Sequence, residues 1–177
     1  STQITYTYSD SYGCENTKTF EIQVYPRPSV SFNDVPSACI GDEPFDLLTY
    51  VVPTTGTFAG TNVNDTEFNP ISAGNYNVTY KVTENNCQNT MSKTIIVNKL
   101  PEITLITNDV ECVNTGEVHP TVSPVGGTLK INGDVVSSIN TETLPVATDY
   151  ELVYEYTDAS TKCFNTTSKN FEIRKLE

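Results

Sequence analysis

The chain has 177 residues, of which 37% are hydrophobic and 18% are charged. This balance is typical of globular proteins, and no apolar run approaches the ~20 residues that a membrane-spanning helix requires. The formal net charge of −12 at pH 7 repels the phosphates of nucleic acids and anionic membrane surfaces. The composition therefore argues against a nucleic-acid partner and against a membrane span.

Residues 1–28 have the pattern of a β-hairpin. An apolar residue occupies every second position of 4–8 and of 20–24, on either side of a turn, and this alternation predicts two strands with one apolar face. The pattern returns at 76–97 and 150–173, and each copy carries Cys-x-Asn-Thr just after its turn. A lone hairpin has marginal stability in water, so we expect the first copy to be the end of a domain whose earlier strands lie upstream.

The cysteines repeat at a fixed spacing. The hairpin cysteines Cys14, Cys87 and Cys163 lie 73 and 76 residues apart, and a second set, Cys39 and Cys112, also lies 73 residues apart. Self-similarity at a fixed period indicates a repeat array. The predicted segments are the C-terminal hairpin of a truncated repeat (1–28) and two whole repeats (29–101 and 102–177).

Each whole repeat is predicted to contain about seven short strands and no helix. Pro, Gly, Asn and Asp separate the strands at turn spacing, which is typical of a compact antiparallel sandwich. We therefore expect an all-β chain of tandem immunoglobulin-like β-sandwich repeats. The entry to the penultimate strand at Tyr76 resembles the corner where immunoglobulin-like domains set a tyrosine against the preceding loop, but core packing is the favoured interpretation of these tyrosines. The strands predicted for the second segment are 29–34, 44–51, 56–59, 61–64, 66–69, 75–83 and 90–98.

The cysteines predict disulfides within each repeat. The second segment contains only Cys39 and Cys87, so these two should pair if the repeat folds alone. By the same reasoning Cys112 should pair with Cys163, whereas truncation leaves Cys14 without a partner. The hairpin cysteines share the parity of the apolar residues that follow, so their sulfurs should face the core. Recurring cysteines indicate an oxidising, extracellular compartment.

Metal and catalytic sites have little support in the sequence. A zinc site needs close ligand pairs, and the one histidine, His119, has no such neighbour. The acidic stretches 42–46 and 62–67 could hold calcium through loop oxygens, but neither has EF-hand spacing. No catalytic triad or phosphate-binding loop is recognisable. We expect no enzyme activity and no cofactor, with calcium in the acidic loops as the alternative.

Several motifs carry a family resemblance. They are G-T-F-x-G-x-x-V at 56–63, F-x-P-x-x-A-G-x-Y-x-V-T-Y at 68–80, C-x-N-T at 87–90 and I-x-V at 95–97. Together they resemble the immunoglobulin-like tandem repeats of Bacteroidota surface proteins. These include large cell-surface adhesins, some of them gliding-motility adhesins of the SprB type exported by the type IX secretion system. The resemblance covers essentially the whole chain and implies an extracellular, cell-surface location.

Three functions are compatible with these observations. The favoured one is a stalk or shaft of a cell-surface adhesin, in which neighbouring repeats of the same chain are the partners. Proline-containing linkers of about four residues reach at most roughly 14 Å, so successive repeats should stack end to end. A glycan-binding module is a second possibility, although the chain has no tryptophan for an aromatic platform. The third is an accessory domain of a large secreted enzyme. The ligand or surface recognised is not specified by the sequence.

Overall fold

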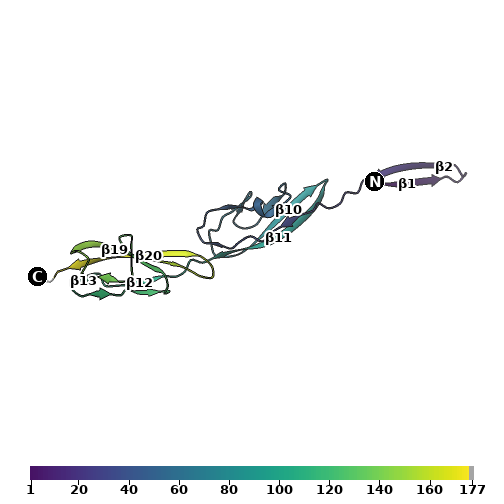
Figure 1. The fold of residues 1–177 in the computed structure, drawn as a ribbon. Helices are drawn as coiled ribbons and strands as arrows, with labels where there is room; N and C mark the ends of the chain where they lie inside the picture. The colour runs from purple at the N-terminus through teal and green to yellow at the C-terminus, as the bar shows by residue number, and fades with distance from the viewer. Residues whose placement is uncertain (176–177) are drawn as a thin grey trace. The chain divides into compact units, whose positions relative to one another are not determined.

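The computed structural model describes residues 1–175, and the side chains of all of these except 147 and 148. The described backbone is almost entirely β-structure, with one short 3-10 helix and no α-helix. The all-β class predicted from the sequence is therefore confirmed, with several antiparallel sheets (Figure 1). The end of the predicted third segment, residues 176 and 177, lies outside the described part of the chain.

Contacts between Cα atoms divide the chain into two compact units. Their limits differ from the predicted segment boundaries, because the long strands β10 (Gly74–Glu84) and β11 (Cys87–Asn98) contribute residues to both units. The boundaries after residues 28 and 101 therefore stay a sequence prediction. Unit 1 comprises residues 1–35, 45–68 and 77–94, and unit 2 comprises residues 36–44, 69–76 and 95 onward.

The N-terminal hairpin consists of β1 (Thr2–Ser9) and β2 (Glu15–Ile22), which pair antiparallel along their whole length. The carboxylate of Asp10 organises its turn by accepting hydrogen bonds from the backbone N–H groups of Tyr12 and Cys14, each at 2.9 Å. Every residue of both strands is exposed. The hairpin register is thus set by local pairing, without the burial of an apolar face.

The strands of residues 31–98 form three sheets, in which short strands surround the long pair β10 and β11. Strand β4 (Ala38–Cys39) runs parallel to β11, whereas β7 (Thr57–Ala59) runs antiparallel to β10. The first sheet pairs β3 (Ser31–Phe32) with β6 (Val51–Val52). The second places β9 (Glu67–Phe68) between β5 (Phe45–Asp46) and β8 (Val63–Asn64). The third has the strand order β4, β11, β10, β7.

The prediction of one strand over 44–51 is wrong at its centre. Residues Leu47–Tyr50 form a 3-10 helix, and Asp46 caps its start by accepting a hydrogen bond from the Leu48 N–H at 2.9 Å. A side chain that binds its own backbone in this way competes with strand pairing. The two long strands predicted for the same segment are confirmed as β10 and β11.

The core of unit 1 is centred on the aromatic ring of Tyr80, which is fully buried. Its ring centroid lies 4.5 Å from that of Phe58 and 6.3 Å from that of Phe32. Leu47 and Phe68 are also fully buried. The buried tyrosine thus serves as a core residue, as the alternation of its strand predicted, and aromatic pairs of this kind add to the free energy gained by burial.

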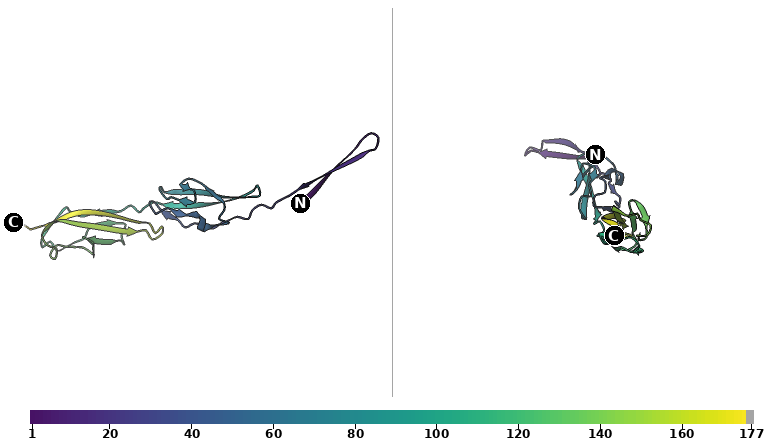
Figure 2. Two further views of the ribbon diagram at one scale, coloured as in Figure 1. Left: turned by 90° about the horizontal axis from the view of Figure 1, so that it is seen from above. Right: turned by 90° about the vertical axis from the view of Figure 1, so that its left-hand side faces the viewer.

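In unit 2, residues 104–174 form a two-layer arrangement. The long pair β19 (Ala147–Thr157) and β20 (Phe164–Arg174), green to yellow in Figure 2, belongs to a five-stranded sheet. Two smaller sheets contribute the opposing apolar residues. The five-stranded sheet has the order β13 (Val110–Cys112), β20, β19, β16 (Thr128–Ile131), β17 (Asp134–Val136). One smaller sheet pairs β12 (Thr104–Ile106) with β15 (Thr121–Ser123), and the other pairs β14 (Glu117–Val118) with β18 (Ile139–Asn140).

The core of this arrangement follows the alternation of the hairpin strands. Leu152 and Ile173 are fully buried, and the rings of Tyr150 and Phe171 stack with centroids 5.3 Å apart. Ile139 from β18 is also fully buried among them. The apolar face that the sequence assigns to this hairpin therefore packs between two layers, as expected of a β-sandwich.

Candidate functional site

Among the described cysteines, one disulfide forms, between Cys39 and Cys163, whose Cα atoms are 5.6 Å apart. The predicted bridge from Cys39 to Cys87 is therefore wrong, and so is the predicted bridge from Cys112 to Cys163. The observed bond joins residues 124 positions apart, which the sequence analysis placed in different segments. Cys14, Cys87 and Cys112 carry free thiols.

The length of the last strand explains why the predicted pairs do not form. Cys39 is in register with Asn98 at the end of β11, whereas Cys87 begins that strand. About eleven residues at ~3.3 Å each separate the two ends by roughly 36 Å, and a disulfide needs Cα atoms within about 7 Å. Cys112 and Cys163 are separated in the same way. Cys112 is in register with the last residue of β20, and Cys163 immediately precedes the first residue of that strand.

The turn before Cys163 is organised by the carboxylate of Asp158. One oxygen of this carboxylate accepts hydrogen bonds from the backbone N–H and the hydroxyl of Ser160 and of Thr161, at 2.6 to 3.0 Å. The hydrogen bond from the Ser160 hydroxyl and those from Thr161 lower the pKa of Asp158 to about 2. Cys163 itself is fully buried. The bridge is thus held at one end by a turn with many hydrogen bonds.

At the other end of the bridge, the backbone N–H of Cys39 donates to Oδ2 of Asp42 at 2.7 Å. The Asp42 carboxylate, one of the predicted calcium ligands, therefore closes its own loop, and Asp46 caps the 3-10 helix. Within residues 1–175, no group of three or more His, Cys, Asp or Glu side chains is placed to hold a metal ion. The carboxylates of Asp42 and Asp46 thus accept hydrogen bonds from backbone N–H groups of their own loops.

The asparagine of the Cys-x-Asn-Thr motif has a role that the sequence analysis missed. The side-chain amide of Asn165 donates to the backbone oxygen of Pro101 at 2.8 Å, and that of Asn89 donates to Pro28 at 2.9 Å. Each proline belongs to a linker predicted between segments, more than 60 residues earlier in the chain. The recurrence of the motif in the sequence was the signal that could have indicated a role for this asparagine. The asparagine fastens the incoming linker to the hairpin.

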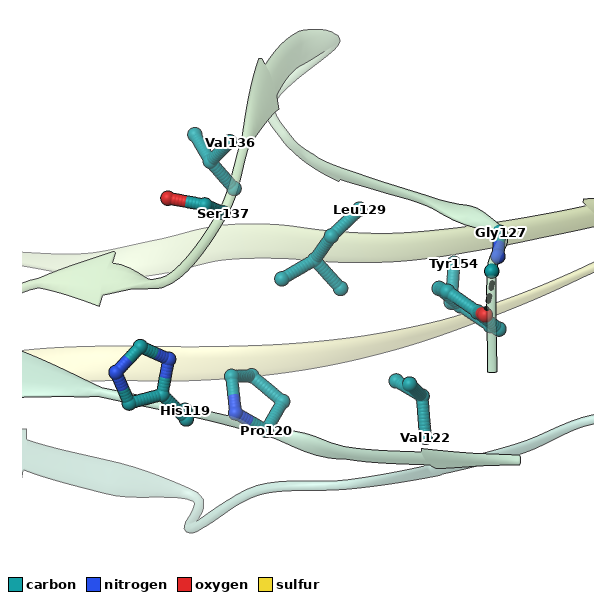
Figure 3. Close-up of a pocket in the computed structure, with 9 residues that line it drawn as sticks. His119, Pro120, Val122, Gly127, Leu129, Val136, Ser137 and Tyr154 are labelled. Carbon is teal, nitrogen blue, oxygen red and sulfur yellow. Dashed lines mark hydrogen bonds between the residues drawn. The ribbon is translucent and has the colours of Figure 1, made fainter. Parts of the chain in front are cut away.

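Two further tyrosine arrangements fix loops against the long strands. The hydroxyl of Tyr76 donates to the backbone oxygen of Ser72 at 2.8 Å, so this tyrosine is set against the preceding loop, whereas the sequence analysis favoured core packing. The Tyr154 hydroxyl donates to Pro124 O at 2.6 Å. It also accepts from the Gly127 N–H at 2.7 Å (Figure 3). The same arrangement is formed by Tyr80 with Pro53 O at 2.5 Å and Gly56 N–H at 2.7 Å.

An open hollow of about 210 Å³ lies beside Tyr154 (Figure 3). His119 and Ser137 both line it, and His119 Nε2 lies 3.8 Å from a carboxylate oxygen of Glu117. No hydrogen bond joins Ser137 to His119 among the described residues, and the Tyr154 hydroxyl is already bonded on both sides. The hollow therefore has both polar and apolar walls, and its described residues do not form a hydrogen-bonded pair of nucleophile and base.

No family model matches the chain, and no curated protein matches it. In the part of the chain that the structure describes, no helix has both the length and the apolar character needed to cross a bilayer. The features that distinguish this structure are therefore the Cys39–Cys163 bridge and the hydrogen bonds that hold each linker.

Proposed function

We propose that the chain is a non-enzymatic structural segment of an extracellular, cell-surface protein, in which repeats follow one another as a shaft. The resemblance to adhesin repeats, including those of gliding-motility adhesins exported by type IX secretion, favours this location. A disulfide persists in an oxidising compartment, and the bond between Cys39 and Cys163 fits this location. The partners of each repeat are its neighbours in the same chain.

The observation that carries the proposal is the position of the bridge. A disulfide inside one sandwich would stabilise that sandwich and leave the connection to the next one free. The bond between Cys39 and Cys163 lies within unit 2 and joins positions on either side of the predicted boundary after residue 101. A covalent bond there limits how far successive segments can turn or separate, which is a property that a load-bearing shaft requires.

The linker contacts support the same proposal. Asn165 holds the carbonyl of Pro101 at the place where the chain passes from one predicted segment to the next. The proline ring fixes one backbone angle of this linker, and the hydrogen bond removes further freedom. The disulfide and the linker hydrogen bond together restrict the motion of the chain at the predicted boundary after residue 101.

Small-angle X-ray scattering on the oxidised native chain tests the proposal. We expect an elongated particle with a narrow distribution of dimensions, unchanged when calcium is chelated. The double variant Cys39→Ser/Cys163→Ser should keep the β-sheet signal in circular dichroism but give a broader distribution, because one junction constraint is gone. Cys112→Ser is the matched control and should scatter as the native chain does. A folded-back, compact particle from the native chain would contradict the proposal.

A further inference from the structure

Cys112 occupies the same local structure as the bonded Cys39. Cys39 lies on β4 in parallel register with the last residue of β11, and Cys112 lies on β13 in parallel register with Arg174, the last residue of β20. The residue after each cysteine donates its backbone N–H to that same last residue, at 3.0 Å from Ile40 and at 2.9 Å from Val113. Cys112 is nevertheless exposed and free.

The local turn beyond each of these cysteines is also the same. The carbonyl of Cys39 accepts a hydrogen bond from the Asp42 N–H three residues on, and the carbonyl of Cys112 accepts one from Thr115, both at 3.2 Å. Two matching sets of backbone hydrogen bonds place the two sulfurs at equivalent positions relative to their strands. In one case the position holds a disulfide, and in the other it holds an exposed thiol.

Cys87 is in turn the counterpart of the bonded Cys163. Each begins a Cys-x-Asn-Thr motif whose asparagine binds a linker proline. The Sγ of Cys87 lies 3.8 Å from the backbone oxygen of Tyr25. Tyr25 stands eleven residues after its hairpin cysteine, as Asn98 does, and Asn98 is the register partner of Cys39. The free thiol of Cys87 therefore lies beside the stretch of chain that would present a Cys39-like partner.

We propose that Cys112 and Cys87 are half-sites for further bridges of the Cys39–Cys163 kind, each taking a second copy of a repeat as its partner. Cys112 bonds the hairpin cysteine of a following copy, and Cys87 bonds the first-loop cysteine of a preceding copy. The inference rests on the proposed shaft and specifies how its segments are joined. Each junction of the array then carries one disulfide.

The chemistry of each bridge is an ordinary thiol oxidation. Two thiols lose two protons and two electrons as the S–S bond forms, and a disulfide oxidant accepts the electrons and is released as two thiols. Oxidised glutathione supplies this reaction in the test. The existing bridge shows that the geometry of such a junction allows the bond.

Two extended chains test the two half-sites separately. In the first, residues 102–177 are repeated after residue 177, and in the second, residues 29–101 are repeated after residue 101. Both are folded in a glutathione redox buffer, alkylated and mapped by mass spectrometry without reduction. We expect Cys112 bonded to Cys163 of the added copy in the first chain. In the second we expect Cys39 of the upstream copy bonded to Cys87 of the downstream copy.

The matched controls carry one serine each, Cys163→Ser in the added copy of the first chain and Cys39→Ser in the upstream copy of the second chain. Each should return the corresponding half-site to a free thiol while the original bridge at Cys163 remains. The assignment of a half-site is overturned if, in the unsubstituted chains, the original Cys112 of the first chain or Cys87 of the downstream copy in the second chain is a free thiol or is bonded to any other cysteine. X-ray scattering of the same chains separates the two levels of the proposal. A particle that lengthens without the new bridge leaves the shaft intact and refutes the inference, whereas one that does not lengthen refutes the shaft.

Discussion

The N-terminal hairpin and the β19–β20 hairpin have the same sequence pattern but opposite surroundings. Both alternate apolar and polar residues and carry the Cys-x-Asn-Thr motif. Both pair antiparallel, and the second has a register shift between Ala147 and Tyr150. In the first, Tyr6 is 63% exposed and Ile22 is 45% exposed, whereas Tyr154 in the second is 2% exposed. Strand pairing is therefore local, while burial depends on whether other strands pack against the hairpin.

This difference separates two contributions to the stability of a hairpin, strand pairing and packing against other strands. Cross-strand pairing fixes the register of each hairpin, but two strands alone have marginal stability in water. Packing against a second layer adds the hydrophobic free energy, and side chains that reach loops or linkers add specific hydrogen bonds. We call the N-terminal hairpin β1–β2 the bare hairpin, and the hairpins β10–β11 and β19–β20 the covered hairpins. Matched substitutions should change the free energy of unfolding differently in the two kinds, since only the covered hairpins have these extra contacts.

The largest effect is expected at an isoleucine that occurs eight residues after the hairpin cysteine in both places, Ile22 and Ile95. Ile95 is fully buried, so Ile95→Ala should cost about 2 to 5 kcal/mol through lost burial and the cavity left behind. Ile22→Ala should change stability by less than about 0.5 kcal/mol. Native-state hydrogen exchange of the strand amides measures both. Equal losses at the two positions would show that burial does not distinguish the hairpins.

A smaller loss is expected from removing one hydroxyl. Tyr154→Phe leaves the Pro124 carbonyl and the Gly127 N–H without their partner, at a cost of about 1 to 3 kcal/mol. Tyr6 is the matched control, because Tyr6 and Tyr154 each pair with the residue two positions after the motif asparagine. Tyr6→Phe should be neutral within error in urea unfolding. A neutral Tyr154→Phe would mean that the loop finds other partners.

The linker contact should contribute about 1 kcal/mol, the net value of a typical hydrogen bond. Asn165→Ala removes the bond to Pro101, whereas Asn16→Ala changes the equivalent position of the bare hairpin, where no hydrogen bond to a linker forms among the described residues. Thermal melting compares the two variants. We expect a lower melting temperature for the first variant and no change for the second. A loss of the same size in both would assign the effect to the turn instead of the linker.

The smallest effect concerns pH. The pKa of Asp158 is lowered from 3.8 to about 2, so the folded turn holds the ionised carboxylate more tightly than the unfolded chain does. Its contribution to stability is therefore complete above about pH 4 and is lost as the pH falls through 2. NMR titration of the Asp158 side-chain carbon should give a midpoint near 2. A midpoint near the ordinary value would show that the hydrogen bonds from Ser160 and Thr161 do not persist in solution.

Much of the fold was predictable because strand alternation and turn residues act locally. The long strands β10 and β11 followed from such patterns. The cysteine pairing did not, since parity tells which face of a sheet a sulfur occupies but not which end of the strand it lies at. Cys39 and Cys87 share a segment and yet stand at opposite ends of β11. The linker role of Asn165 was hidden for a similar reason, because its partner is 64 residues away.

Peptide mapping of the oxidised native chain without reduction tests the central claim most directly. The chain should be digested under acidic conditions that prevent disulfide exchange, after free thiols have been alkylated. The account predicts one cross-linked peptide pair that joins Cys39 to Cys163, with alkylated Cys14, Cys87 and Cys112. Recovery of Cys39 bonded to Cys87 together with Cys112 bonded to Cys163 would contradict it, and would place every bridge within a segment instead of between segments.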